Sequence, residues 1–232
     1  MIYVTSDIHG YSLDEFKLFL DKVGFCDDDF CFVLGDVIDR GADGIKWLKW
    51  LMVQPNFQLI LGNHEAMLLA CDFLFETITE DAIDRLTGTK LGIYNNWISN
   101  GGQHTLDALS LLRESEVEDI LDYLRDAPLY DTVTVGDKDF VLTHSGLGSF
   151  DKDKKLSDYC KTDLLWTRPS LNANYFDDVT TIFGHTPTLY YGEEYKGKAI
   201  VTDTWIDIDT GAACGLKPML LRLDDMQEFY MD

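Results

Sequence analysis

Five short apolar runs in this chain each lead directly to a side chain that can bind a metal ion. The runs cover residues 2–5, 31–35, 57–61, 140–143 and 181–184. Short apolar runs bounded by turn residues are typical of buried strands. We therefore predict a strand at each run. The residues that follow are expected at the carboxyl ends of strands, where open α/β sheets bind their ligands.

Helical patterns separate the first three predicted strands. Ser12 and Glu15 have the spacing of a capping box, so a helix is expected to begin there and to end before Gly24. Apolar residues recur at helical spacing from 45 to 52, and Pro55 marks the break before the third strand. The predicted order is β-α-β-α-β.

The segment from about 71 to 127 shows helical patterns and no convincing strand. We interpret it as a helical insertion with a turn at 100–102 and with a later helix whose capping box would begin at Ser115. His104 lies on a predicted helix of this insertion, and we interpret it as a solvated or hydrogen-bonded histidine rather than a ligand. The insertion is the expected source of substrate specificity.

Strand patterns return after residue 131. Predicted strands at 132–135 and 138–143 flank Gly136-Asp137, a hairpin turn signal, and further strands are predicted at 180–183, 199–202 and 219–223. Three βα units followed by hairpins favour an α/β (α+β) fold of two mixed sheets packed together with helices outside. One domain over residues 1–232 is expected, because single cores grow to about 250 residues.

The composition predicts a soluble protein: 46% of the 232 residues are hydrophobic, but no apolar run approaches the roughly 20 residues of a membrane span. No membrane partner is therefore expected. The chain starts on a strand without a secretory pattern, and its five cysteines contain no Cys-x-x-Cys pair, so we predict a cytoplasmic protein with reduced thiols. The net charge of −22 disfavours nucleic acid as a partner. The sequence leaves the oligomeric state open.

The residues after the five runs are of metal-binding types, and four of the chain's five histidines lie there. Unrelated surface or core histidines would rarely produce that placement. Oxygen and nitrogen donors without sulfur suit divalent Mn, Fe or Zn, and Mn²⁺ is our preferred ion. The candidate ligands are Asp7, His9, Asp36, Asn63, His144 and His185.

Six ligands are too many for one ion that also keeps a water molecule. Two ions that share Asp36 would use them economically, with Asp7 and His9 on the first ion and Asn63, His144 and His185 on the second. Two ions about 3.5 to 4 Å apart can stabilise both the attacking and the leaving oxygen of a displacement at phosphorus. Their positive charge would also attract phosphate into a strongly acidic protein.

These motifs resemble those of the calcineurin-like metallophosphoesterase superfamily. The segments at 7–10, 35–41 and 62–65, His144 and Gly184-His185 occur in the order of that family. Within it, the chain is similar to the phosphoprotein phosphatases of the prokaryotic and phage type over nearly its whole length, including Trp166-x-Arg168 and residues 208–212.

The resemblance implies an αββα sandwich with a dinuclear metal site between the sheets. It also implies roles for residues outside the ligand set: His64 as general acid, Asp39 as its orienting partner, and Arg40 and Arg168 as the side chains that hold phosphate. Ser6 and Leu61 depart from the common pattern of the family without removing a ligand.

Three functions are compatible with the sequence. The leading hypothesis is hydrolysis of phosphomonoesters, above all phosphoserine and phosphothreonine in proteins, by a metal-bridging hydroxide and without a phosphoenzyme. The alternative is a symmetric dinucleoside tetraphosphate hydrolase, since those enzymes share most of the motifs. A catalytically inactive metal-binding scaffold is a more distant possibility, because a scaffold has no need of His64, Asp39 and Arg40.

Overall fold

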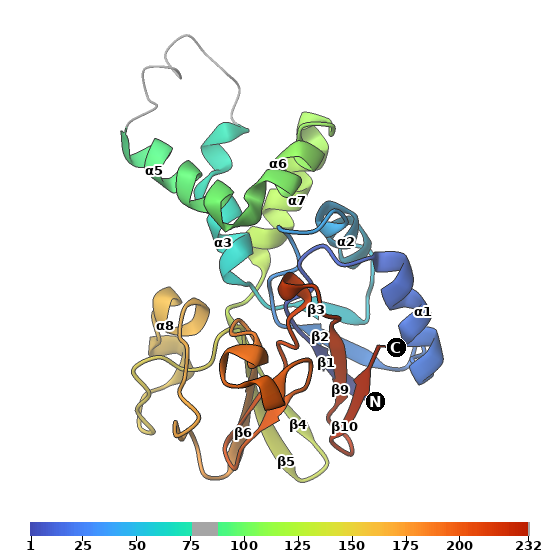
Figure 1. Ribbon diagram of the computed structural model, residues 1–232, viewed down its shortest axis with the longest axis vertical. Helices are drawn as coiled ribbons and strands as arrows, with labels where there is room; N and C mark the ends of the chain where they lie inside the picture. The colour runs from blue at the N-terminus through green and yellow to red at the C-terminus, as the bar shows by residue number, and fades with distance from the viewer. Residues whose placement is uncertain (76–87, 232) are drawn as a thin grey trace.

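The computed structural model describes residues 1–75 and 88–231. Its strands form two mixed sheets of five strands each (Figure 1). The first sheet has the order β10 (Gln227–Tyr230), β9 (Met219–Arg222), β1 (Ile2–Thr5), β2 (Phe30–Val33), β3 (Phe57–Leu59). The second has the order β4 (Tyr130–Val135), β5 (Lys138–Thr143), β6 (Val179–Phe183), β8 (Trp205–Asp207), β7 (Ile200–Val201).

Alternation along the strands builds the layers of the molecule. Val4 and Phe32 of the first sheet share a buried apolar cluster with Phe140 and Leu142 of the second, so the two sheets pack face to face. Neighbouring residues in the same strands, such as Tyr3, point to the opposite face. There they pack with helices α1 (Leu13–Val23) and α2 (Gly44–Leu51). The predicted fold of two packed mixed sheets with helices is confirmed.

The outer face of the second sheet is covered differently. Phe183 and Trp205 pack there against Leu164 of the short helix α8 (Lys161–Leu165) and against side chains from irregular segments. Single turns of 3₁₀ helix complete the chain: η1 (Asp72–Leu74), η3 (Leu156–Asp158), η4 (Thr188–Tyr190), η5 (Glu193–Tyr195) and η6 (Ala212–Cys214). No helix among the described residues is long and apolar enough to cross a membrane.

The predicted helical insertion contains helices and no strand in its described residues. After α3 (Asn63–Ala70) come α5 (Gly88–Trp97), a π-helical stretch (Ile98–Gly102), α6 (Gln103–Leu109) and α7 (Glu114–Asp126). Residues 76–87 of the predicted insertion lie outside the described residues. In Figure 1 these helices stand together beyond the ends of the strands.

Local signals predicted helix ends with mixed success. Ser12 accepts a hydrogen bond from the backbone N–H of Glu15 at 3.3 Å, and Gly24 ends α1 with a φ of 76°, as expected. The N-cap predicted at Ser115 is wrong, because α7 already begins at Glu114. Its N-terminus is closed by Glu116, which accepts from the backbone N–H of Arg113 at 3.3 Å.

Two strands escaped prediction. β8 has three residues, all buried, and is too short to show a period. β10 is polar and lies at the edge of its sheet, where only β9 pairs with it. The strand predicted at 199–202 is real but shorter, and the turn predicted at 100–102 falls within a π-helical stretch.

Candidate metal centre

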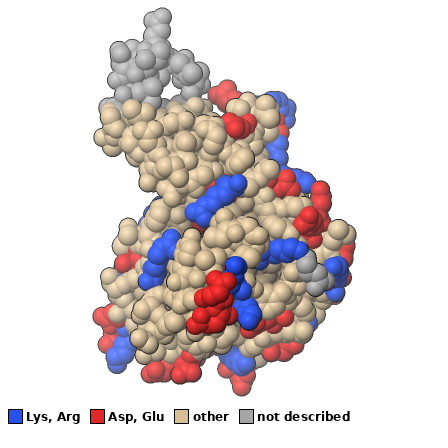
Figure 2. All heavy atoms as spheres, viewed as in Figure 1, with Lys and Arg blue, Asp and Glu red and all other residues tan. Residues whose placement is uncertain are grey.

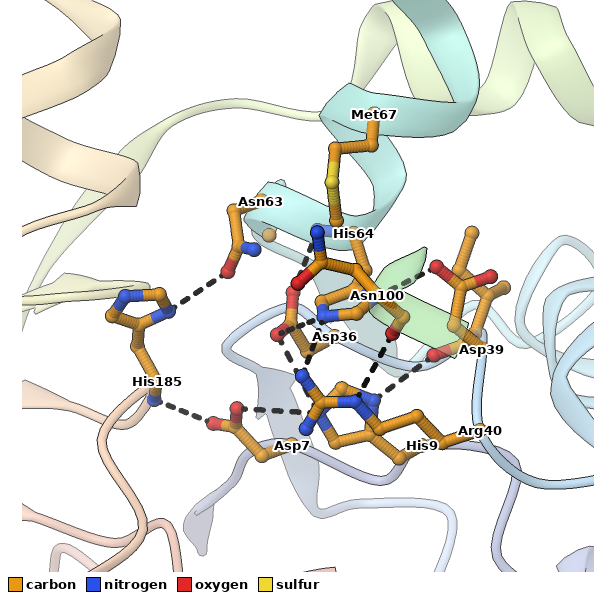
Figure 3. A network of polar contacts seen from close by, with 12 residues as sticks. Asp7, His9, Asp36, Asp39, Arg40, Asn63, His64, Met67, Asn100 and His185 are labelled. Carbon is orange, nitrogen blue, oxygen red and sulfur yellow. Dashed lines mark hydrogen bonds and ion pairs between the residues drawn. The ribbon is translucent and has the colours of Figure 1, made fainter. Parts of the chain in front are cut away.

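The candidate site lies where segments following β1, β2, β5 and β6 meet the first turn of α3. Side chains from these segments point toward one another there (Figure 3). Each of the six predicted ligands is at most 6% exposed. The structure thus brings into one buried cluster the side chains that the sequence pattern nominated: Asp7, His9, Asp36, Asn63, His144 and His185.

The backbone of this cluster has an uncommon conformation. Asp7, His9, Asp36 and His185 have φ angles of 50°, 45°, 53° and 70°. A non-glycine residue in this left-handed region costs on the order of 1 to 3 kcal/mol and persists only where the surrounding structure holds it. Such strain gathers at functional sites, and its concentration here marks the cluster as more than core packing.

Asp7, His9 and Asp36 direct lone pairs toward a common point. The Nδ1–H of His9 donates a hydrogen bond to the carbonyl of Ile38 at 3.1 Å. The other nitrogen of the neutral ring, Nε2, is therefore unprotonated and can offer its lone pair to a metal ion. This Nε2 lies 3.5 Å from Asp36 Oδ2 and 3.8 Å from Asp7 Oδ1. Asp7 Oδ1 is buried and has no hydrogen-bond partner among the described residues.

A second set of lone pairs converges beside the first. The Nδ1–H of His144 donates to the carbonyl of Leu34 at 2.7 Å, so its Nε2 carries the lone pair. That atom lies 2.8 Å from Asn63 Oδ1 and 3.4 Å from Asp36 Oδ1. Nδ1 of His185 lies 2.8 Å from the same Asn63 oxygen. Asp36 therefore faces both sets, one with each carboxylate oxygen.

The electrostatics of the cluster fit cations. Burial lowers the pKa of His9 well below its ordinary value and also lowers the pKa of His185, so both rings are neutral. Burial, followed by the nearby Asp7, raises the pKa of Asp36 well above its ordinary value. Lone pairs on neutral rings repel the oxygen atoms they face unless a positive charge lies between them. The donor types and their convergence fit two divalent ions that share Asp36.

Side-chain geometry alone suggests a slightly different first set. Among the described His, Cys, Asp and Glu side chains, two groups have donor atoms close enough to hold an ion: His9, Asp36 and His64, and Asp36, His144 and His185. His64 Nε2 lies 3.8 Å from Asp36 Oδ2. However, both ring nitrogens of His64 already have protein partners, whereas Asp7 Oδ1 has none in the described part of the chain. We therefore keep Asp7 as the predicted ligand.

His64 belongs to a separate line of contacts at the edge of the cluster. Its Nδ1–H donates to Asp39 Oδ2 at 2.6 Å, and its Nε2 accepts from Arg40 Nη2 at 3.1 Å (Figure 3). Burial, and then the guanidinium of Arg40, lower the pKa of His64 to about 2, so the imidazole is neutral in this arrangement. Arg40 Nη1 also lies 3.4 Å from His9 Nε2.

The two predicted phosphate-binding arginines line the same pocket over the cluster. Arg40 is held through Nε, which donates to the carbonyl of Asn100 at 3.3 Å. Arg168 Nη1 donates to the carbonyl of His185 at 3.2 Å. The pocket is also lined by Trp166, which is 43% exposed. A ligand above the candidate metal ligands would thus meet two guanidinium groups.

Comparison with known proteins agrees with this geometry. The model of the family described as calcineurin-like phosphoesterase matches residues 1–209. The chain belongs to that family. Membership supports a metal-dependent phosphoesterase among the hydrolases, and it confirms the resemblance inferred from the sequence motifs.

Relatives of this calcineurin-like phosphoesterase include two kinds of enzyme. Serine/threonine-protein phosphatase 2 of Salmonella typhimurium is 29% identical over 217 residues, which cover 92% of this chain and 88% of the relative. The symmetrical bis(5'-nucleosyl)-tetraphosphatase of Buchnera aphidicola subsp. Schizaphis graminum is 44% identical over 71 residues, or 30% of this chain and 26% of that protein. A solved structure described as a candidate diadenosine tetraphosphatase shares the fold, with a TM-score of 0.67 and 16% identity over 98% of this chain and 91% of that one.

Sequence reasoning missed part of the support around this phosphoesterase site. The motif at 62–65 predicted no role for its last residue, Glu65, yet the buried carboxylate of Glu65 holds the segment after β2. Trp97 and Thr105 contact Asp39 from the helical segment formed by α5 and α6, 58 and 66 residues away in the chain. No local sequence pattern predicts contacts between residues so far apart in the chain. His104, by contrast, is exposed on α6 and does not line the pocket, in agreement with its interpretation as a solvated residue.

Proposed function

We propose that this protein hydrolyses phosphomonoesters, and above all phosphoserine and phosphothreonine in proteins, at a dinuclear metal centre. The observation that carries the proposal is the position of Asp36, whose two oxygens face the two separate sets of donor atoms. Asp7 and His9 would complete the first ion site, and Asn63, His144 and His185 the second. Mn²⁺ is the preferred ion, with Fe and Zn as alternatives.

Two divalent ions bound there would polarise the phosphoryl oxygens and lower the pKa of the water that attacks phosphorus. The chain's own side chains would bind the phosphoryl group and protonate the leaving oxygen. Arg40 and Arg168 would each present a planar fork of N–H donors that matches the oxygens of a phosphoryl group. His64, after taking up a proton at Nε2 when Arg40 turns to the phosphoryl group, would protonate the leaving oxygen. Asp39 accepts the hydrogen bond from Nδ1–H and keeps the ring in that orientation.

The charge distribution supports an anionic substrate at this position. The chain carries a net charge of −22, which repels phosphate in general. On the face in Figure 2, Lys and Arg side chains lie across the middle of the molecule, with a group of Asp and Glu side chains among them. Together with bound divalent ions, Arg40 and Arg168 give the pocket a locally positive field.

A protein substrate is favoured because the similarity to the Salmonella phosphatase extends over 92% of this chain. The second candidate function is hydrolysis of symmetric dinucleoside tetraphosphates. The identity to the Buchnera tetraphosphatase, 44% across 71 residues, is higher over a shorter region and favours this function. The exposed rings of Trp166 and Tyr190 at the pocket would also suit stacking on a base.

A substrate screen separates the two functions. Protein loaded with Mn²⁺ is assayed against phosphoserine and phosphothreonine peptides and against a symmetric dinucleoside tetraphosphate, with Asp36→Asn prepared in parallel to exclude a contaminating phosphatase. A higher kcat/KM on the peptides supports the proposal, and preferential release of two nucleoside diphosphates supports the second function. Hydrolysis of neither class would favour another phosphoester substrate or a metal-binding scaffold, and the contacts of His64 with Asp39 and Arg40 argue against the scaffold.

A further inference from the structure

The carboxylate of Asp39 is held by three donors, and two of them come from the helical segment. Oδ2 accepts from His64 Nδ1 at 2.6 Å and from Trp97 Nε1 at 3.0 Å, and Oδ1 accepts from Thr105 Oγ1 at 2.6 Å. Asp39, Trp97 and Thr105 are at most 2% exposed. A buried carboxylate is costly unless hydrogen bonds replace its water, so the helical segment supplies what this carboxylate needs in order to stay next to His64.

Thr105 fixes both the backbone and the side chain of Asp39. Its hydroxyl accepts from the backbone N–H of Asp39 at 3.0 Å while its own proton goes to Oδ1. Asp39 has a φ of 68°, a strained value for a residue other than glycine. One hydroxyl therefore ties this strained backbone to the carboxylate orientation that His64 requires.

Trp97 constrains the other oxygen. An indole Nε1–H can only donate, so it cannot exchange roles with the imidazole that shares Oδ2. Gly102 makes this indole position possible, because a Cβ at that residue would lie 2.6 Å from the Trp97 ring. The approach of the ring to Asp39 thus depends on a glycine within the same turn of the chain.

A kink between α5 and α6 allows Trp97 and Thr105 to contact the same carboxylate. Eight residues of regular α-helix rise about 12 Å, too far for two neighbours of one carboxylate to come from a straight helix. Between α5 and α6 the π-helical stretch contains Gly101 with a φ of 103°. The same kink binds Arg40, whose backbone N–H donates to the carbonyl of Gly101 at 3.0 Å and whose Nε donates to Asn100.

We propose that Trp97 and Thr105 are positioning residues for proton transfer, acting on His64 through Asp39. The inference rests on the proposed phosphomonoesterase function. Nε2 first takes up a proton from solvent as Arg40 turns from the ring to the phosphoryl group. As the P–O bond breaks, that proton passes to the leaving oxygen, and the ring returns to the neutral form with Nδ1–H on Asp39. Without its two helical donors, the carboxylate can turn away and the ring loses its fixed orientation. The helical segment thereby becomes part of the catalytic apparatus, in addition to any role in specificity.

The test uses Trp97→Phe and Thr105→Val, which remove one donor each with little change of shape. Thr105→Ser restores the hydroxyl and should restore activity. Trp47→Phe is the matched control, because Trp47 is equally buried in the same apolar cluster but donates to the carbonyl of Tyr11. Each variant is loaded with Mn²⁺, checked for metal content, and assayed on a phosphoserine peptide and on an aryl phosphate with a weakly basic leaving group.

We expect each donor-removing variant to lose roughly tenfold in kcat on the phosphoserine peptide and markedly less on the aryl phosphate, because only the basic leaving group needs the proton. Asp39→Asn should show the same selectivity, and adding Trp97→Phe to it should cause little further loss. Trp47→Phe should leave the ratio of the two rates unchanged. Equal slowing on both substrates, or additive losses in the double variant, would mean that Trp97 and Thr105 only maintain the fold.

A readout without turnover separates this inference from the proposed function. In Zn²⁺-loaded, ¹⁵N-labelled protein, the ring nitrogens of His64 should show the Nδ1–H tautomer, and Trp97→Phe or Thr105→Val should increase the other tautomer. Unchanged ring signals in both variants would overturn the positioning role. If the unmodified protein hydrolyses no phosphomonoester, the proposed function fails, and these spectra still decide whether the two residues orient His64.

Discussion

The carboxylate of Glu65 accepts a hydrogen bond of 2.8 Å from the backbone N–H of Asp36. The same carboxylate accepts from Val37 at 2.8 Å, from Ile38 at 3.3 Å and from Gly62 at 3.0 Å. A fully buried side chain at the start of α3 therefore holds the segment that presents the shared ligand. The strained φ of 53° at Asp36 is maintained by these bonds.

Glu65→Gln should destabilise the protein by about 2 to 4 kcal/mol, because the amide NH₂ group replaces an oxygen that accepts two backbone N–H bonds and leaves both donors buried without partners. Urea unfolding measures the change. Glu118→Gln is the control: Glu118 lies on the surface with a side chain 59% exposed, so its change should stay within about 0.5 kcal/mol. Equal midpoints for the two variants would show that the Glu65 contacts contribute little.

Asp36→Asn should weaken both proposed ion sites at once. The unmodified protein should bind two Mn²⁺ ions per chain, because its donor atoms form two sets with one shared carboxylate. Elemental analysis after Mn²⁺ loading and desalting gives the ratio, with the exposed Asp14→Asn as a control that should retain both ions. Saturation at one ion per chain together with full activity contradicts the dinuclear arrangement.

Arg40→Ala and Arg168→Ala should each raise KM and lower kcat. For each variant, the resulting fall in kcat/KM should correspond to roughly 1.5 to 3 kcal/mol, as expected for a hydrogen bond to a charged group. Arg113→Ala removes an equal charge from the surface, where the side chain is 80% exposed and pairs with Glu116, and should leave kinetics unchanged. Steady-state kinetics at fixed ionic strength provide the comparison. If Arg168→Ala behaves like Arg113→Ala, Arg168 does not hold the phosphate.

The strands that present the candidate ligands could be predicted because a buried strand carries its signal in its own residues. The runs at Ile2–Thr5 and Lys138–Thr143 are apolar where they are buried, and a ligand-type residue follows each of them. β8 shows the limit of this reasoning. It is an interior strand of its sheet, between β6 and the edge strand β7, but its three residues are too few to show a pattern.

Contacts between distant residues account for what the sequence could not predict at the site. Asp39 was named from a motif, yet the partners that hold it, Trp97 and Thr105, lie beyond a kink whose geometry follows from tertiary packing. The Asn-Gly-Gly sequence at 100–102 indicated a turn but not its direction. The structure gathers the predicted ligands into one buried cluster, and both predicted arginines line the pocket over it. Their roles stay predictions.

His64→Asn tests whether His64 is the proton donor, as the sequence motif predicts, or a metal ligand, as the donor-atom grouping suggests. Its Nδ1–H is bound to Asp39 at 2.6 Å, and its Nε2 faces Arg40 rather than a free oxygen donor. The carboxylate therefore orients the ring so that Nε2 lies at the pocket. A variant with asparagine should keep both metal ions, since the predicted ligands are untouched.

The kinetic signature follows from the basicity of the leaving group. A serine alkoxide leaves slowly without a proton, so His64→Asn should lose roughly 10²- to 10⁴-fold in kcat on a phosphoserine peptide, the usual contribution of a general acid. An activated aryl oxide departs without one, and the loss on an aryl phosphate should be distinctly smaller. Metal analysis of the same samples separates the two roles. Loss of one ion, or equal slowing on both substrates, would assign His64 to the metal centre instead.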